Sequence, residues 1–197
     1  MTDISKYLKI KSNNIAPSRG KLLISEPFLN DYYFKRSVIL LAEHNDEGSF
    51  GIIMNKPVVD MKFNEVINNF PNFNTQLYLG GPVKNDSLFF VHTLGSKISN
   101  SNEIIDGLYW GGDINEVKEL IMMGYLNENN IRYYVGYSGW ESKQLEEELK
   151  KNSWLVSAMN VKNLLNTKPD NLWKASLDTL GSDYEIWNNF PSNPEMN

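Results

Sequence analysis

The fold class is best inferred from residues 37–54, which read Ser-Val-Ile-Leu-Leu-Ala-Glu-His-Asn-Asp-Glu-Gly-Ser-Phe-Gly-Ile-Ile-Met. Two apolar runs in this segment, at 37–43 and 50–54, are typical of buried β-strands. His44-Asn-Asp-Glu-Gly48 lies between the runs and is rich in residues that favour turns. The segment therefore predicts a hairpin of two antiparallel strands.

Further strands are expected on both sides of this hairpin, because apolar or aromatic runs of similar length recur along the chain. These runs lie at 21–25, 76–79, 87–92, 131–135 and 153–157. Strands and helices do not alternate strictly, which argues against a doubly wound parallel sheet. We predict an α+β fold with a largely antiparallel, curled or barrel-like sheet that carries peripheral helices.

Four helices are predicted, at 63–70, after Asp113, at 144–151 and from about 170 to 181. Asp113 can cap the second helix, with Glu116 completing a capping box and Gly124 supplying a left-handed stop. Ser138 and Glu141 have the same capping-box spacing before the third helix.

Composition limits the class of protein. The chain has 197 residues, of which 41% are hydrophobic, and one domain is the natural expectation at this length. The absence of cysteine excludes disulfides, thiolate metal ligands and a cysteine nucleophile. A net charge of −5 argues against a broad nucleic-acid surface, which needs excess Lys and Arg to neutralise phosphates.

We expect one domain over residues 15–187, an N-terminal extension at 1–14 and a polar tail at 188–197. Trp187 and Phe190, at the start of this tail, could dock on the domain. The N-terminus lacks the apolar run of a signal peptide, and no run approaches the roughly 20 apolar residues of a membrane helix. We therefore expect a cytoplasmic protein.

The chain carries none of the common catalytic or nucleotide-binding motifs. Gly136-Tyr-Ser-Gly139 resembles half of a nucleophile elbow, but Trp140 stands where the motif requires glycine. His44 and His92 each end an apolar strand and could form a metal set with Glu43. The favoured interpretation is that each histidine caps its strand by bonding a nearby backbone group. We predict neither a metal nor a cofactor.

Arg36 and the Gly80-Gly81 corner are candidates for binding an anion. The guanidinium of Arg36 could hold a carboxylate or phosphate, although an ion pair with Asp31, Glu26 or Glu43 is the favoured interpretation. Gly80-Gly-Pro-Val83 links two predicted strands, so a structural turn is favoured over a phosphate-binding loop.

Trp140 and Gln144 could form the wall and polar edge of a site. Alternatively, Trp140 fills the core while the helix that follows presents Glu146, Glu147 and Glu148 to water. The second interpretation is favoured for the glutamates, and both remain open for the tryptophan.

Taken together, the motifs resemble the bacterial YqgE/AlgH family. Gly80-Gly-Pro-Val83 and Gly136-Tyr-Ser-Gly-Trp140 are two of the matching motifs. The full ordered series lies at 20–31, 34–44, 51–57, 80–83, 86–92, 106–109, 136–140, 144–146, 154–156 and 173. Lys56 departs from the usual arginine, and Ser142-Lys143 departs from the usual small-residue pair.

The resemblance implies a single cytoplasmic domain with a mixed, bifurcated sheet folded into a pseudo-barrel and flanked by helices. It implies no particular activity. We favour a binding or regulatory module with a concave site around Arg36, Asn55 and the Gly80-Gly81 corner. The alternative is a hydrolase or transferase for a small anionic metabolite, in which a histidine is the base and Arg36 holds the anion.

No catalytic residue is assigned, and the expected partner is a protein or small molecule, neither nucleic acid nor membrane. The predicted ligand-binding residues are Arg36, His44, Asn55, Gly80, Gly81, His92, Trp140 and Gln144.

Overall fold

The computed structural model describes residues 13–67 and 69–190. Residues 1–12 of the expected extension and 191–197 of the expected tail lie outside this range. The strands are β1 (Leu22–Ser25), β2 (Val38–Asn45), β3 (Gly48–Ile53), β4 (Pro57–Lys62), β5 (Gln76–Leu79), β6 (Val83–His92), β7 (Asn102–Ile105), β8 (Leu108–Trp110), β9 (Ile131–Glu141) and β10 (Trp154–Ser157). The helices are α1 (Phe63–Val66), α2 (Ile114–Met122), α3 (Gln144–Lys150), α4 (Val161–Asn166) and α5 (Pro169–Asp178), with 3-10 helices η2 (Gly95–Lys97) and η3 (Ser182–Asn189).

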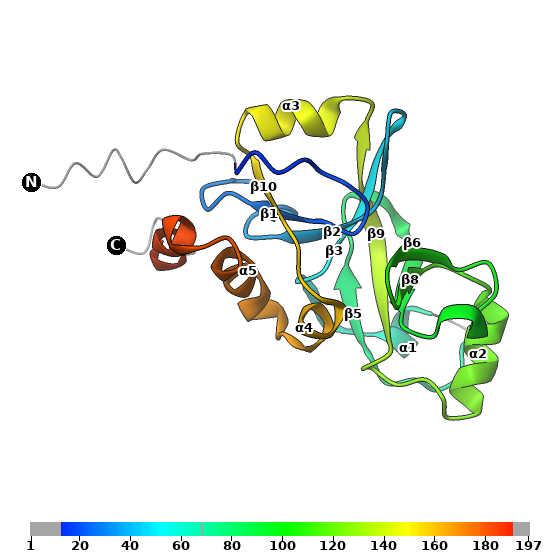
Figure 1. The fold of residues 1–197 in the computed structure, drawn as a ribbon. Helices are drawn as coiled ribbons and strands as arrows, with labels where there is room; N and C mark the ends of the chain where they lie inside the picture. The colour runs from blue at the N-terminus through cyan, green and yellow to red at the C-terminus, as the bar shows by residue number, and fades with distance from the viewer. Residues whose placement is uncertain (1–12, 68, 191–197) are drawn as a thin grey trace, which may run out of the picture.

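The strands form one large, mostly antiparallel sheet in the order β10-β1-β2-β3-β9-β6-β8-β7 (Figure 1). The β2–β3 hairpin predicted from residues 37–54 is confirmed, as is the α+β class. The long strand β9 is shared between two groups of strands. Its last residues pair with β3, and its first residues pair with β6 and, in parallel, with β5.

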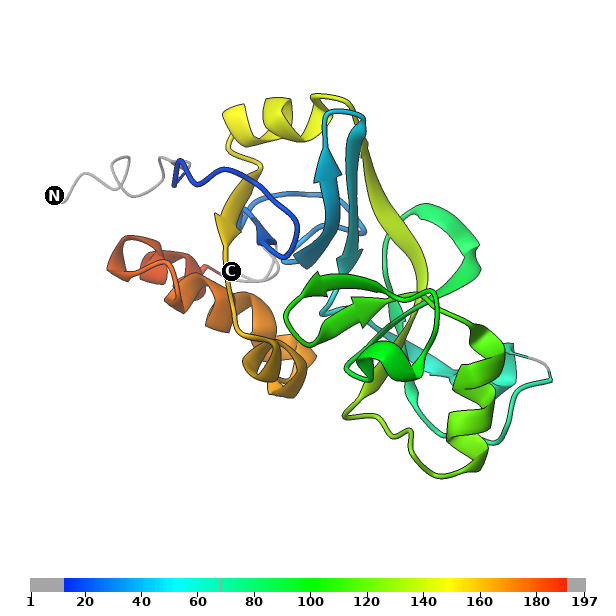
Figure 2. The same cartoon turned by 45° about the vertical axis from the view of Figure 1, so that its right-hand side comes forward.

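The predicted closure into a barrel is wrong. Within the described residues, β10 and β7 are the two ends of the strand path and do not pair with each other. β4 and β5 also leave this path at β9. The two ends of β9 pair with different groups of strands, and these groups diverge. The sheet therefore splits instead of closing (Figures 1 and 2).

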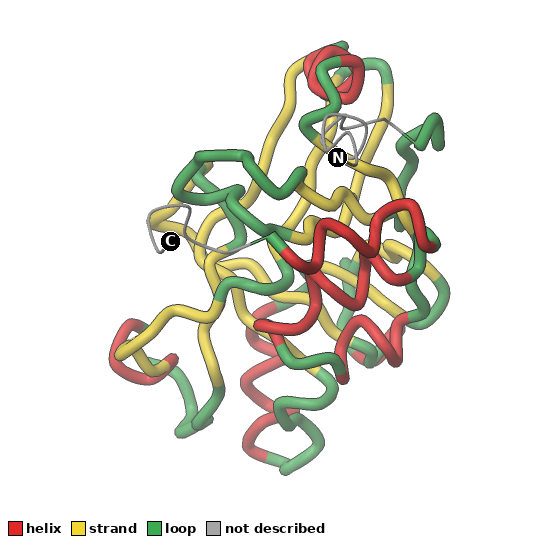
Figure 3. Tube along the Cα trace, turned by 90° about the vertical axis from the view of Figure 1, so that its left-hand side faces the viewer, coloured by secondary structure: helices red, strands yellow, loops and turns green. Residues whose placement is uncertain are grey.

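Helices cover the sheet at three places, each with its own apolar core. Helices α4, α5 and η3 pack on the first core, which includes Leu40 and Trp173 (Figure 3). A second core around Tyr133 lies near α2, and a third lies beneath α3 at the top of Figure 1. No helix in the described part of the chain is both long and apolar enough to cross a bilayer.

The C-terminal aromatics dock on the domain, as expected. Trp187 is buried, and the Phe190 ring centroid lies 4.8 Å from that of Phe28. The helix predicted at 63–70 is limited to α1, because Asn69 has a φ of 59° and Pro71 disfavours a helical residue before it.

One half of the predicted capping box at α2 is correct. Asp113 accepts a hydrogen bond from the Asn115 N–H at 2.8 Å, and Gly124 follows the helix with a φ of 75°. Glu116 does not bond back to the cap. Its carboxylate instead accepts from the backbone N–H and hydroxyl of Ser99.

The capping box predicted before α3 is wrong, because β9 continues through it. Ser138 lies inside β9, and its hydroxyl donates to the Gly80 carbonyl at 3.2 Å. The helix instead follows Lys143, which has a φ of 65° and makes no side-chain cap.

Candidate functional site

The β2–β3 hairpin and the end of β9 form a three-stranded surface with two faces. Side chains alternate between the faces along each strand, so residues paired across strands share a face. The registers define two adjacent rows on opposite faces: His44, Ser49 and Trp140 in one, and Glu43, Phe50 and Gly139 in the other.

Helix α3 covers the face that carries Trp140. The indole N–H groups of Trp140 and Trp154 both donate to Oε2 of Glu148, at 2.8 and 2.7 Å. Gln144 donates to the other Glu148 oxygen at 3.1 Å. The expectation that Glu148 faces water is therefore wrong, because this carboxylate is the acceptor that two buried indoles require.

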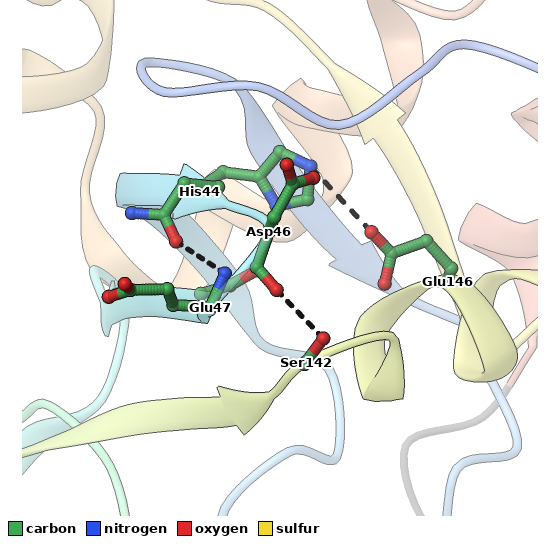
Figure 4. A network of polar contacts seen from close by, with 7 residues as sticks. His44, Asp46, Glu47, Ser142 and Glu146 are labelled. Carbon is green, nitrogen blue, oxygen red and sulfur yellow. Dashed lines mark hydrogen bonds and ion pairs between the residues drawn. The ribbon is translucent and has the colours of Figure 1, made fainter.

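His44 lies on the same face, at the end of β2 (Figure 4). Its Nδ1 is 2.8 Å from the Ser49 hydroxyl, and its Nε2 is 3.9 Å from a Glu146 oxygen. The Ser142 hydroxyl donates to the Asp46 carbonyl at 2.7 Å. These contacts tie the hairpin tip to the start of α3, and His44 bonds side chains where a backbone bond was predicted.

The opposite face of the hairpin is open and forms a cleft of about 650 Å³. The cleft is lined by Glu43, Asn45, Glu47, Gly48, Ser49, Phe50, Val83, Tyr137, Gly139, Trp140, Glu141 and Gln144. Three of these residues are exposed glutamates, and none of the described lining residues is Lys, Arg or His. The described lining therefore carries acidic and no basic side chains, a charge that favours cations.

The half-buried rings of Phe50 and Tyr137 line the cleft beside these carboxylates and pack on Trp110 and Phe89. The Phe50 ring centroid lies 4.9 Å from that of Tyr137 and 4.8 Å from that of Trp110. Phe89 lies 5.4 Å from Tyr137. Aromatic faces attract cations as carboxylates do, so both kinds of side chain favour the same ligand charge.

The absence of a side chain at Gly139 leaves space in the cleft. A Cβ at this position would lie 3.2 Å from the Tyr137 ring and 3.7 Å from a Val83 methyl group. Its φ is not positive, so space in the cleft, and not backbone strain, distinguishes glycine here.

Arg36 and Asn55 make internal contacts instead. Arg36 donates to the Phe190 carbonyl, and its guanidinium carbon lies 4.8 Å from the Trp173 ring centroid. Among the described residues, Arg36 forms none of the predicted ion pairs, because its head group points to the C-terminal segment. Asn55 bonds the Val38 N–H and the Arg36 carbonyl, which fixes the start of β2.

Gly80 and Gly81 form the predicted turn between β5 and β6. A Cβ on Gly80 would lie 2.2 Å from the Gly136 carbonyl oxygen, and one on Gly81 would lie 2.3 Å from the Tyr137 carbonyl oxygen. The corner thus packs its backbone directly on β9. It adjoins the end of the cleft at Val83 and Tyr137.

His92 is buried at the end of β6 and bonds backbone groups, as predicted. Its Nε2 is 3.1 Å from the Gly111 carbonyl oxygen, and its Nδ1 accepts from the Leu94 N–H at 3.2 Å. Burial lowers the pKa of this imidazole, although the bond to Gly111 opposes the change. Protonation would also place two N–H groups against each other at Nδ1.

We expect His92 to make stability fall at mildly acidic pH. Its folded-state pKa is lowered, so protons bind the unfolded chain more strongly, and stability is lost as pH falls below the unfolded value of about 6.5. The His92→Gln variant removes this titration. Its unfolding midpoint should change less than that of the native protein between about pH 6.5 and 5. Parallel losses in both proteins over this range would contradict the prediction.

The structure therefore groups the predicted residues unequally. Trp140 and Gln144 belong to the cleft lining, but both side chains donate to Glu148 on the α3 side, where His44 also lies. Arg36, Asn55 and His92 make the separate internal contacts described above. Within residues 13–67 and 69–190, no group of three His, Asp or Glu side chains is arranged to hold a metal ion.

Several cleft residues were not predicted as site residues from the sequence, of which Glu141 and Tyr137 are the clearest examples. Tyr137, Gly139 and Glu141 are spaced by two and share one face of β9. That alternation could have identified them had the strand been extended beyond residue 135.

Comparisons with known proteins agree with the motif series. Residues 22–185 match the family model described as AlgH-like. A UPF0301 protein of Bacteroides thetaiotaomicron is 48% identical over 194 residues, which are 98% of each chain. The solution structure of the AlgH protein from Pseudomonas aeruginosa is 27% identical, with a TM-score of 0.71 over 90% of this chain and 97% of that one.

A crystal structure of a Corynebacterium diphtheriae protein shares the fold, with a TM-score of 0.72 at 22% identity, and covers 96% of this chain and 100% of that one. The family expected from the motifs is thus confirmed. The chain belongs to the AlgH-like family.

Proposed function

We propose that this protein is a binding module whose ligand is positively charged and occupies the cleft on the open face of β2, β3 and β9. One observation carries the proposal. The lining combines the carboxylates of Glu43, Glu47 and Glu141 with the rings of Phe50 and Tyr137, and no described lining residue is basic.

Concavity strengthens the attraction of these carboxylates for a cation, because the low-dielectric walls of a cleft focus the field. An ammonium or guanidinium group above Phe50 or Tyr137 gains a further cation–π contribution of about 0.5–2 kcal/mol. Asn45 and Gln144 supply neutral polar groups at the edge of the same cleft.

The contacts of the other predicted residues favour binding over hydrolysis or transfer on an anionic metabolite. Both ring nitrogens of His92 take part in internal hydrogen bonds. Arg36 contacts Trp173 and the Phe190 carbonyl. We therefore assign Arg36 and His92 to supporting the fold. Trp140 and Gln144 form the boundary of the cleft, held there by their bonds to Glu148.

The proposal is tested by thermal shift with cations (spermidine and acetylated arginine amide) and anions (citrate and glucose 6-phosphate). A ligand at about 100 times its dissociation constant adds about 2.7 kcal/mol, which raises the midpoint by about 5–10 °C. We expect cations alone to stabilise the native protein. The double variant Glu43→Gln, Glu141→Gln should lose this effect.

The matched control is Glu119→Gln, Glu185→Gln, which removes two exposed carboxylates outside the cleft lining. It changes net charge equally and should keep the cation response. If both double variants lose the cation-induced rise in midpoint equally, the rise depends on overall charge and not on the cleft. Stabilisation by the anions alone would contradict the proposed ligand class.

A further inference from the structure

The directions of the backbone N–H and C=O groups in β3 determine which backbone groups of β9 form hydrogen bonds with β3. The Ile53 N–H donates to the Gly80 carbonyl at 2.9 Å, away from β2. The N–H and C=O groups of successive residues point to opposite sides of a strand. The backbone N–H and C=O of the odd-numbered residues of β3 therefore point toward β9. Ser138 and Trp140 pair with those residues. It follows that the N–H and C=O of Gly139 point away from β3.

A second observation agrees with this direction. The Glu141 N–H, two residues further along, donates to the Gln144 side-chain oxygen at 3.0 Å instead of to β3. On the same outer side, Tyr137 pairs with Val83 of β6. Among the described strands none pairs with Gly139 on this side, and Figure 2 shows the upper part of β9 open there.

This unpaired edge borders the cleft, because Gly139 and Glu141 line it. Exposed strand edges are templates for pairing with another chain, and natural proteins usually block them. Here the Glu141 N–H is occupied by the exposed side chain of Gln144. Gly139 has no side chain, which allows another backbone to approach closely.

We infer that the ligand of the cleft is an extended peptide segment that pairs with β9 at Gly139 and Glu141 and carries basic side chains. One peptide carbonyl accepts the Gly139 N–H, and another replaces the Gln144 oxygen at Glu141. A peptide N–H donates in turn to the outward Gly139 carbonyl. Alternate peptide side chains then face the cleft, where Glu43 and Glu141 attract Lys or Arg. The inference rests on the proposed cationic cleft and adds the strand pairing.

Calorimetric titration separates the two claims. The probes are an acetylated, amidated hexapeptide of alternating valine and arginine, the same peptide with alternate backbone amides N-methylated, and acetylated arginine amide. Methylation removes N–H donors but keeps every charge. We expect the methylated peptide to bind at least about tenfold more weakly than the unmodified one.

Equal affinity of the two peptides would overturn strand pairing while leaving the cationic cleft intact. Failure of all three probes to bind would refute the cationic cleft, and the inference with it. Unchanged or tighter binding of the unmodified peptide to a variant that lacks the outward N–H would also contradict the inference.

That variant is Gly139→Pro, which removes the outward N–H without removing a hydrogen bond to β3. Its matched control, Gly139→Ala, adds a Cβ but keeps the N–H. We expect proline to lower peptide affinity about tenfold or more, and alanine, which narrows the cleft but keeps the N–H, to lower it by less. If the proline variant fails to fold, the comparison of methylated and unmodified peptides decides alone.

Discussion

Gly136→Ala should lower the free energy of unfolding by about 4 kcal/mol or more, among the largest losses for a single substitution. Gly136 has a φ of 68°, a region that costs an L-residue roughly 1–2 kcal/mol. A Cβ there would also lie 2.4 Å from the Gly81 carbonyl oxygen and 2.9 Å from that of Val83. Both contacts are with backbone, which cannot rotate aside, so β6 and β9 would have to separate where the sheet divides.

Gly107→Ala is the matched control for this substitution. Gly107 has a φ of 78°, but nothing lies within 4 Å of its Cβ position. This variant should show the conformational cost alone, about 1–2 kcal/mol. Chemical denaturation of both variants measures the difference, and equal losses would show that the close approach of β6 to β9 is unimportant.

Glu148→Ala should lower the free energy of unfolding by about 3 kcal/mol and the thermal midpoint by about 6–12 °C. Trp140 and Trp154 are both buried, and both indole N–H groups donate to Glu148. Removing the carboxylate leaves two buried donors without an acceptor, each of which costs about 1–3 kcal/mol. Near-ultraviolet circular dichroism should also change, because the two indoles lose their common partner.

The neighbouring Glu147→Ala variant is the control. Glu147 is exposed and pairs only with Lys150, so its loss should leave the midpoint close to that of the native protein. Glu148→Gln keeps one acceptor oxygen and should fall between the two alanine variants. A Glu148→Ala midpoint equal to that of Glu147→Ala would mean that the indole bonds do not hold α3 on the sheet.

The main strands could be predicted because their apolar runs are local features. The run at 37–43 and the run at 153–157 mark β2 and β10 directly. β7 and α4 were missed, because β7 has four residues, of which two are polar, and α4 spans only six residues. The predicted strand at 131–135 ended too early, because the apolar run stops at Gly136, which has a positive φ within the longer strand β9.

The site could be predicted only in fragments, because it depends on pairing between distant segments. Trp140 and Gln144 stood out as unusual residues near a turn. That Glu43 and Glu141 share a face follows only from the registers of β2 and β9 with β3. Glu148 was likewise predicted to be exposed to water. The sequence of the helix carries no information about the indoles of two strands that contact this carboxylate.

An amide NMR titration of the native protein with the valine–arginine hexapeptide tests the ligand site most directly. The cleft account predicts that the largest shifts occur at Gly139, Glu141 and the β2–β3 hairpin, with smaller shifts at Arg36 and His92. Largest shifts around Arg36 and Asn55, or no shift along β3 and β9 at millimolar peptide, would contradict it.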